Sequence, residues 1–124
     1  MAAEAKVRQK FDLEERTALF GEAVIRFAKT IPLNKVTEPL ISQLVRAATS
    51  VCANYIEADD ADSRKDFRYR IGIARREARE TKHWLRMIVA ADESIKQAAR
   101  VLWQEAKELN LIFGRIRQSV EQRK

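Results

Sequence analysis

The fold is decided by residues 64–91, which read RKDFRYRIGIARREARETKHWLRMIVAA. Apolar or small residues recur there at alternating steps of four and three, at Phe67, Ile71, Ala74, Ala78, Thr81, Leu85 and Ile88. This spacing places them on one face of a helix and is typical of the core-facing seam of a helical bundle. Ser63 precedes the segment and Asp66 follows three residues later, as in a capping box. We therefore predict a helix over residues 64–91.

Segments on both sides of this helix carry the same alternation. We predict helices over residues 13–30, 37–58 and 95–121. Their seams are Leu13, Thr17, Phe20, Val24, Phe27 and Ile31; then Ile41, Leu44, Ala48, Val51 and Tyr55; then Ile95, Ala99, Leu102, Ala106, Leu109, Phe113, Ile116 and Val120.

The ends of these helices have their own local signals. Asp12 and Thr37 stand where N-caps are expected, and Pro39 follows in a first turn, where its missing N–H costs little. Pro32 ends the first helix, because a residue before proline avoids the helical region. Residues 1–11 either extend the first helix or fray.

The connections between the four segments are short, and short connections place successive helices antiparallel. We therefore predict an all-α protein, a single up-down-up-down left-handed four-helix bundle that forms one domain over residues 1–124. With 3 glycines and 2 prolines in the chain, there are too few turn residues for a β-sandwich or barrel.

Composition also excludes several functional classes. One cysteine cannot form an intrachain disulfide, and one histidine beside it nearly excludes a zinc site or a Cys/His nucleophile pair. No glycine-rich phosphate loop is present. No apolar run approaches the roughly 20 residues that span a bilayer, and the N-terminus lacks the apolar core of a signal peptide. We expect a cytoplasmic, non-enzymatic protein without a catalytic residue, metal, cofactor or membrane partner.

Two features could suggest a site but have plainer interpretations. Glu80 and His83 match half of a di-metal motif, which needs two such pairs and two further glutamates. Both fall on outward positions of the helix, so we expect a surface pair. Cys52 lies among small residues, and we expect a buried structural thiol.

The positive charge is concentrated in one segment. The formal net charge is +6, and residues 64–86 contain nine basic and three acidic residues, which accounts for all of it. Five of the basic residues stand on one side of the predicted helix over about 27 Å. This basic stripe consists of Arg68, Arg75, Arg79, Lys82 and Arg86. None of these five has an acid three or four residues away.

An unneutralised row of this kind indicates an anionic partner, and we predict that the basic stripe binds nucleic acid. The alternative is a solvated face whose charges meet acids of the last helix, such as Glu105 and Glu108, or of a neighbouring subunit.

A second row of polar residues lies on the helix predicted over residues 37–58. This polar stripe consists of Gln43, Arg46, Ser50, Asn54 and Glu57. A plain solvent face would be richer in Lys and Glu, whereas amide side chains can pair across a contact. We interpret the polar stripe as an oligomer interface or as a polar network between helices.

These central residues resemble a known family. Residues 42–58 read SQLVRAATSVCANYIEA, and they are followed by Ser63, Asp66-Phe67, Ile73-Ala74, Glu77, Glu80 and Trp84-Leu85. The pattern is similar to that of the bacterial four-helix-bundle proteins encoded in intervening sequences of the 23S ribosomal RNA gene. Tyr55 between Asn54 and Ile56, and Ala58 in place of a glycine, depart from it.

The resemblance implies a bundle that assembles as a ring, commonly a pentamer, with no established enzymatic activity. It also implies a relation to accessory proteins of diversity-generating retroelements, which engage nucleic acid through a basic surface. Two hypotheses follow: a homo-oligomer that binds nucleic acid, with RNA preferred, and a ring-forming protein-interaction scaffold that binds a protein partner and no nucleic acid.

Overall fold

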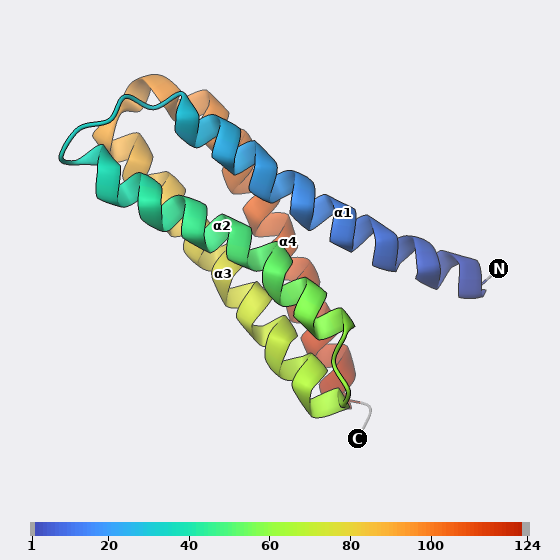
Figure 1. Ribbon diagram of the computed structural model, residues 1–124. Coiled ribbons are helices and arrows are strands. Elements are labelled where there is room, and N and C mark those ends of the chain that lie inside the picture. The colour runs from blue at the N-terminus through green and yellow to red at the C-terminus, as the bar shows by residue number, and fades with distance from the viewer. Residues whose placement is uncertain (1, 123–124) are drawn as a thin grey trace.

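The computed structural model describes residues 2–122, with side chains described for residues 13–121. Four long helices account for most of this range: α1 (Ala2–Lys29), α2 (Thr37–Asp59), α3 (Arg64–Ala91) and α4 (Lys96–Gln122). A short 3-10 helix, η1 (Glu93–Ile95), joins α3 to α4. Figure 1 shows that successive helices run in opposite directions. The described part is therefore an all-α bundle, as predicted; the left-handed twist remains a prediction.

The predicted seams form the core. All of their positions are buried or half-buried, and Val24, Leu44, Leu85 and Phe113 are fully buried. The two threonines of the seams are also fully buried. Their hydroxyl groups donate to backbone carbonyls of the preceding turn, Thr17 to Leu13 O at 2.7 Å and Thr81 to Glu77 O at 2.8 Å, so neither leaves a buried polar group unpaired.

At the start of α1, the Asp12 cap was predicted wrongly. Of the two alternatives for the preceding residues, extension of the helix or fraying, the structure shows extension over residues 2–11: α1 begins at Ala2 and continues through Asp12. Residues 2–11 contain neither Gly nor Pro and are rich in Ala, Lys, Gln and Glu, which favour helix. A good cap residue therefore does not start a helix when helix-forming residues precede it.

α2 begins at Thr37, within the predicted bounds, but its capping side chain differs from the prediction. Thr37 was expected to cap this helix, but its hydroxyl group donates to Pro32 O at 2.8 Å and accepts from the N–H of Asn34 at 3.0 Å. Oδ1 of Asn34 accepts from the N–H groups of Val36 and Thr37, both at 2.9 Å. Asn34 thus supplies the side-chain acceptor at this end. At α3 the prediction was correct, because Ser63 Oγ accepts from the N–H of Asp66 at 3.1 Å.

The four helices do not pack equally. α3 packs closely between α2 and α4, whereas α1 packs on α2 and contacts α4 less extensively. Figure 1 shows α1 diverging from the other helices toward its N-terminus. A groove lined by residues of both helices lies between α1 and α4. Among the described residues, no helix is long and apolar enough to cross a membrane.

Candidate nucleic-acid interface

The basic stripe lies along the side of α3 that borders α4. Arg68, Arg75 and Lys82 are half-buried, and Arg79 and Arg86 are exposed. The half-buried members lie against α4, which reduces the freedom of their side chains. The stripe is therefore partly held in place by the fold rather than fully solvated.

Two members of the basic stripe have partners on α4. Nη2 of Arg68 lies 2.9 Å from Oε1 of Glu121, in a pair that is largely exposed and so contributes little to stability. Nζ of Lys82 lies 5.1 Å from the centroid of the Trp103 ring, a cation–π contact that leaves its charge uncompensated. Within the part of the chain that the structure describes, Arg75, Arg79 and Arg86 have no acidic partner.

The acids that we named as alternative partners do not neutralise the stripe. Glu105 binds Arg16 of α1 through two N–O contacts of 2.8 Å. This bidentate pair raises the pKa of Arg16, with the hydrogen bond as the main cause and burial opposing it. Glu108 adds a weaker attraction to the same arginine. Both acids therefore serve the α1–α4 contact.

Two hollows open along the basic stripe. The first, which we call the Trp103 hollow, has a volume of about 420 Å³. It is lined by Arg76, Arg79, Glu80, Lys82, His83, Arg86 and Trp103. Its lining thus combines the Trp103 indole with four cationic side chains and one carboxylate. Lys107 also lies over the Trp103 ring, at 5.8 Å, so cations from α3 and α4 approach the same indole.

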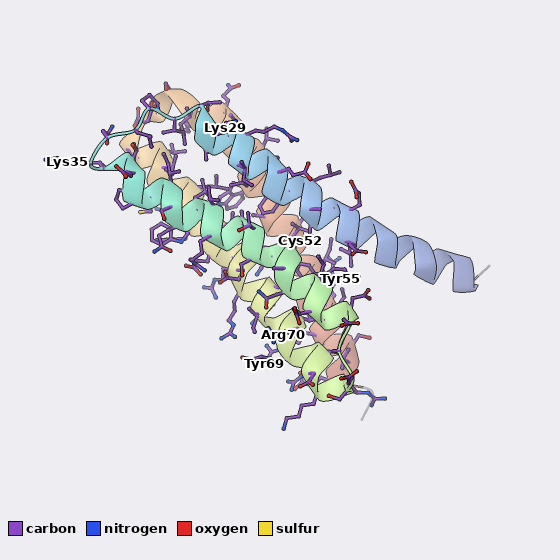
Figure 2. All side chains as sticks on the ribbon, viewed as in Figure 1. Lys29, Lys35, Cys52, Tyr55, Tyr69 and Arg70 are labelled. Atoms are coloured by element: carbon purple, nitrogen blue, oxygen red, sulfur yellow. The ribbon has the colours of Figure 1, made fainter. Side chains whose placement is uncertain are left out.

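The second hollow, which we call the Gly72 hollow, has a volume of about 440 Å³. It is lined by Lys65, Arg68, Tyr69, Gly72, Arg75, Arg76 and Arg117. Five of these seven residues are cationic and none is acidic. Tyr69 is 60% exposed, and Figure 2 shows it beside Arg70 on the N-terminal half of α3. Its charge is more one-sided than that of the Trp103 hollow, whose lining includes Glu80.

Arg117 was missed in the sequence, because it belongs to α4 and lies outside the stripe on α3. The helices are antiparallel, so the position of the α3–α4 turn determines which α4 residues face α3. A register argument from the turn at residues 92–95 would have placed Arg117 near Gly72. Arg76 lines both hollows and joins them.

The polar stripe of α2 lies against α3 and forms two small networks. In the first, Arg46 forms ion pairs with two acids of α3, Glu77 at 2.9 Å and also Glu80. Nε of Arg46 donates to Oε1 of Gln43 at 3.0 Å. Gln43 and Arg46 nevertheless remain exposed in the single chain. The acids that neighbour Arg76 in the sequence are thus engaged by α2.

The environment of Glu80 favours its charged form. Burial opposes ionisation, but hydrogen bonds from Trp84 Nε1 at 3.1 Å and from Arg46 outweigh it, and the pKa of Glu80 is lowered. In the second network, Asn54 donates to Ser50 O at 2.9 Å and to Ser50 Oγ at 3.0 Å. Arg70 extends this network to α3 with a 3.5 Å contact to Asn54 Oδ1. Glu57 is exposed and belongs to neither network.

Glu80 and His83 do not form a metal site in this arrangement. The Glu80 carboxylate faces Arg46 and Trp84, while the exposed His83 ring packs edge-on against Trp84 at 4.9 Å. No group of three or more metal-ligating side chains occurs among the residues that the structure describes. Cys52 is half-buried, which is less than the full burial that we expected.

Comparison with known proteins places these features in a wider context. Residues 9–115 match the model of a family described as 23S rRNA-intervening sequence protein. The chain is also similar to a crystal structure of a protein with unknown function from the S23 ribosomal protein family of Bacteroides thetaiotaomicron. The sequences are 25% identical, the TM-score is 0.79, and the match covers 88% of this chain and 97% of that chain. No curated protein matches the chain significantly.

Proposed function

The chain belongs to the 23S rRNA-intervening sequence protein family. From this premise and the geometry above, we propose that it is a non-enzymatic, oligomeric protein that associates with nucleic acid and prefers RNA. The contact surface is the basic stripe together with its two hollows. One observation carries the proposal: the Gly72 hollow gathers five cationic side chains and no carboxylate.

Phosphate groups match this surface better than acidic side chains do. Guanidinium groups present paired N–H donors that fit phosphate oxygens, and four of the five cations of the Gly72 hollow are arginines. The basic stripe runs along α3 for about 27 Å, which is long enough to follow several nucleotides. Contacts of this kind fix position and carry little sequence information.

Salt-dependent binding tests the proposal. Binding through about five phosphates of single-stranded RNA should weaken with salt at a log–log slope of about −3.5, because each neutralised phosphate contributes about −0.7. Replacing Arg75, Arg79 and Lys82 together with Gln should weaken binding to all sequences alike and flatten the slope by about 2. The seam is untouched, so helical content by circular dichroism should stay unchanged.

A triple variant elsewhere supplies the matched control. Arg26, Lys29 and Lys35 are exposed and line neither hollow, and Figure 2 shows Lys29 and Lys35 where α1 and α2 join. Their replacement with Gln removes the same charge and should change the slope much less. If both variants weaken binding equally, net charge alone attracts the RNA and the basic stripe is not its surface.

The scaffold hypothesis has an observation of its own. The groove between α1 and α4 has a volume of about 1200 Å³ and exposes apolar side chains, among them Val101, 70% exposed, and Leu19, 51% exposed. Such a surface suits a protein partner or another subunit. If the wild type binds no nucleic acid even at low salt, a protein-interaction scaffold becomes the better account.

A further inference from the structure

Two glycines bring α3 and α4 together at the Gly72 hollow. A Cβ atom on Gly72 would lie 3.4 Å from Nε of Arg117, and one on Gly114 would lie 3.6 Å from Cδ of Arg75. Each helix thus offers a glycine against which an arginine of the other helix lies. Neither glycine has a positive φ, so the glycines supply space and not an unusual backbone conformation.

Three arginines that line this hollow have N–H donors without an acceptor. The Nε atoms of Arg68, Arg75 and Arg117 are buried and have no hydrogen-bond partner among the described residues. A buried donor without an acceptor is unfavourable, and each of these belongs to a charged group. All three atoms belong to residues that line one hollow, so an acceptor bound there could pair with them.

A further contact fixes the axial register of α4 relative to α3. Nδ2 of Asn110 on α4 donates to the backbone carbonyl of Arg75 on α3 at 2.9 Å. This bond joins the helices one turn from Gly114, so the arginines start from a backbone that is already positioned. A preorganised group of donors binds an anion with less loss of side-chain freedom than mobile surface lysines do.

We propose that the Gly72 hollow is a discrete phosphate-binding site, in which Arg117 of α4 joins Arg68 and Arg75 of α3 around one phosphate group. The phosphate oxygens supply the acceptors that the Nε atoms lack, and Lys65 and Arg76 add charge at the rim. Glu121, which pairs with Arg68, competes with the phosphate. That the phosphate comes from a nucleic acid rests on the proposed function; that the hollow binds phosphate does not.

The direct test follows the arginine Nε–H resonances by NMR while inorganic phosphate replaces chloride at constant ionic strength. Those of Arg68, Arg75 and Arg117 should shift together, and those of Arg26, Arg100 and Arg115, which are exposed and line neither hollow, should move little. Equal shifts of all arginines would show a diffuse ion atmosphere and would overturn the site.

Variants of neighbouring residues sharpen the test. Arg117→Gln should weaken phosphate binding by at least about tenfold, because a charged donor pair is lost. Arg115→Gln is the matched control, since Arg115 is exposed on the same helix and does not line the hollow; it should change binding by less than about twofold. Glu121→Gln should strengthen binding about two- to fivefold by releasing Arg68. Equal effects of Arg117→Gln and Arg115→Gln would overturn the proposal.

The source of the phosphate is distinguished with short uridine oligomers that carry a 5′-hydroxyl or a 5′-phosphate. Shifts of the same three resonances by both oligomers assign the site to an internal backbone phosphate, and shifts by the phosphorylated oligomer alone assign it to a chain end. If inorganic phosphate shifts the three resonances but no oligomer binds, the site stands and the proposed function fails. If RNA binds without shifting them, the proposed function stands and the site fails.

Discussion

Gly21 is a position in α1 where the packing against α2 leaves room for a larger residue. It is buried in this helix, and a Cβ atom there would lie 3.8 Å from Ala48 O and 3.8 Å from Cα of Thr49, both in α2. These are ordinary contact distances, so alanine fits without displacing α2.

We predict that Gly21→Ala stabilises the protein by about 0.5 to 1 kcal/mol, because alanine loses less backbone freedom when a helix forms. Urea denaturation measures the change. A valine at the same position is a useful comparison, since its branched side chain overfills the contact and should remove the gain. A destabilising effect of alanine would show that the two helices have no room for a methyl group.

Tyr55 is the residue whose ionisation the fold most clearly opposes. Burial raises its pKa to about 12, and the negative charges of Asp59 and Glu14 add to the effect. Its ring lies 5.9 Å from that of Phe113, inside the core. The folded state therefore holds the phenol in its neutral form more strongly than the unfolded chain does.

A raised pKa contributes stability that is fully present below the unfolded pKa, near 10, and is lost as the pH rises through the folded pKa, near 12. We predict that the stability of the wild type falls in this window by up to about 1.4 kcal/mol per pH unit through this group. Tyr55→Phe should remove that part of the slope. The difference in phenolate absorbance between the two proteins isolates Tyr55, and an equal slope in both would contradict the prediction.

At the scale of the element, Arg46 joins α2 to α3. It contacts Glu77 and Glu80, and these contacts raise its pKa, the hydrogen bond to Glu80 being the main cause and burial opposing it. The Glu77 side chain is only 13% exposed, so it depends on this partner more than a surface acid would. The arginine itself is half-exposed, which reduces the energy of the contact.

We predict that Arg46→Gln destabilises the protein by about 1 kcal/mol near pH 7. The lowered pKa of Glu80 contributes stability above its unfolded pKa, and this contribution is lost as the pH falls through the folded pKa. The difference between wild type and variant should therefore shrink in acid, as urea denaturation at several pH values can measure. Arg26→Gln, which breaks an exposed pair within α1, is the control and should cost less than about 0.5 kcal/mol. A loss that persists unchanged in acid would point to packing instead of charge.

The element scale also separates what the sequence could predict from what it could not. The bounds of α3 follow from local signals, since the seam and the Ser63 cap are both contained in neighbouring residues. The start of α1 was left open between extension and fraying of residues 1–11, because a local cap signal at Asp12 competed with helix-forming residues before it. The start of α2 at Thr37 was predicted correctly. Its capping side chain was missed because the acceptor, Asn34, stands in the loop and not at the helix end.

The candidate site divides in the same way. The basic stripe could be predicted because its residues share one helix and one periodicity. Arg117 could not be found by spacing within α3, since its place depends on the register of α4. The pairing of Glu77 and Glu80 with Arg46 could not be predicted either. An acid on α3 can pair with a base on its own helix or with one on α2, and spacing within α3 does not decide between them.

At the scale of the whole molecule, α4 separates two different surfaces. Toward α3 it borders the cationic hollows, and toward α1 it borders the apolar groove. If subunits assembled through the groove, the basic stripe would lie outside the interface between them. Assembly and phosphate binding would then be separable by substitution, and a ring would present several copies of a weak phosphate site to one RNA.

We predict that the wild type is a homo-oligomer, with the pentamer favoured by the family resemblance, and that Val101→Glu converts it into smaller species. Val101 is 70% exposed at the α1–α4 groove, and a carboxylate buried there between subunits would have no partner. Leu33→Glu is the matched control, because Leu33 is 72% exposed and lies outside the groove, in the connection between α1 and α2. Light scattering should show a lower mass for Val101→Glu alone, with helical content unchanged by circular dichroism. The smaller species should also bind a long RNA more weakly than the oligomer does, while each Gly72 hollow keeps its affinity for inorganic phosphate. A wild type that is monomeric, or a Val101→Glu variant of unchanged mass, would show that the groove does not hold the subunits together.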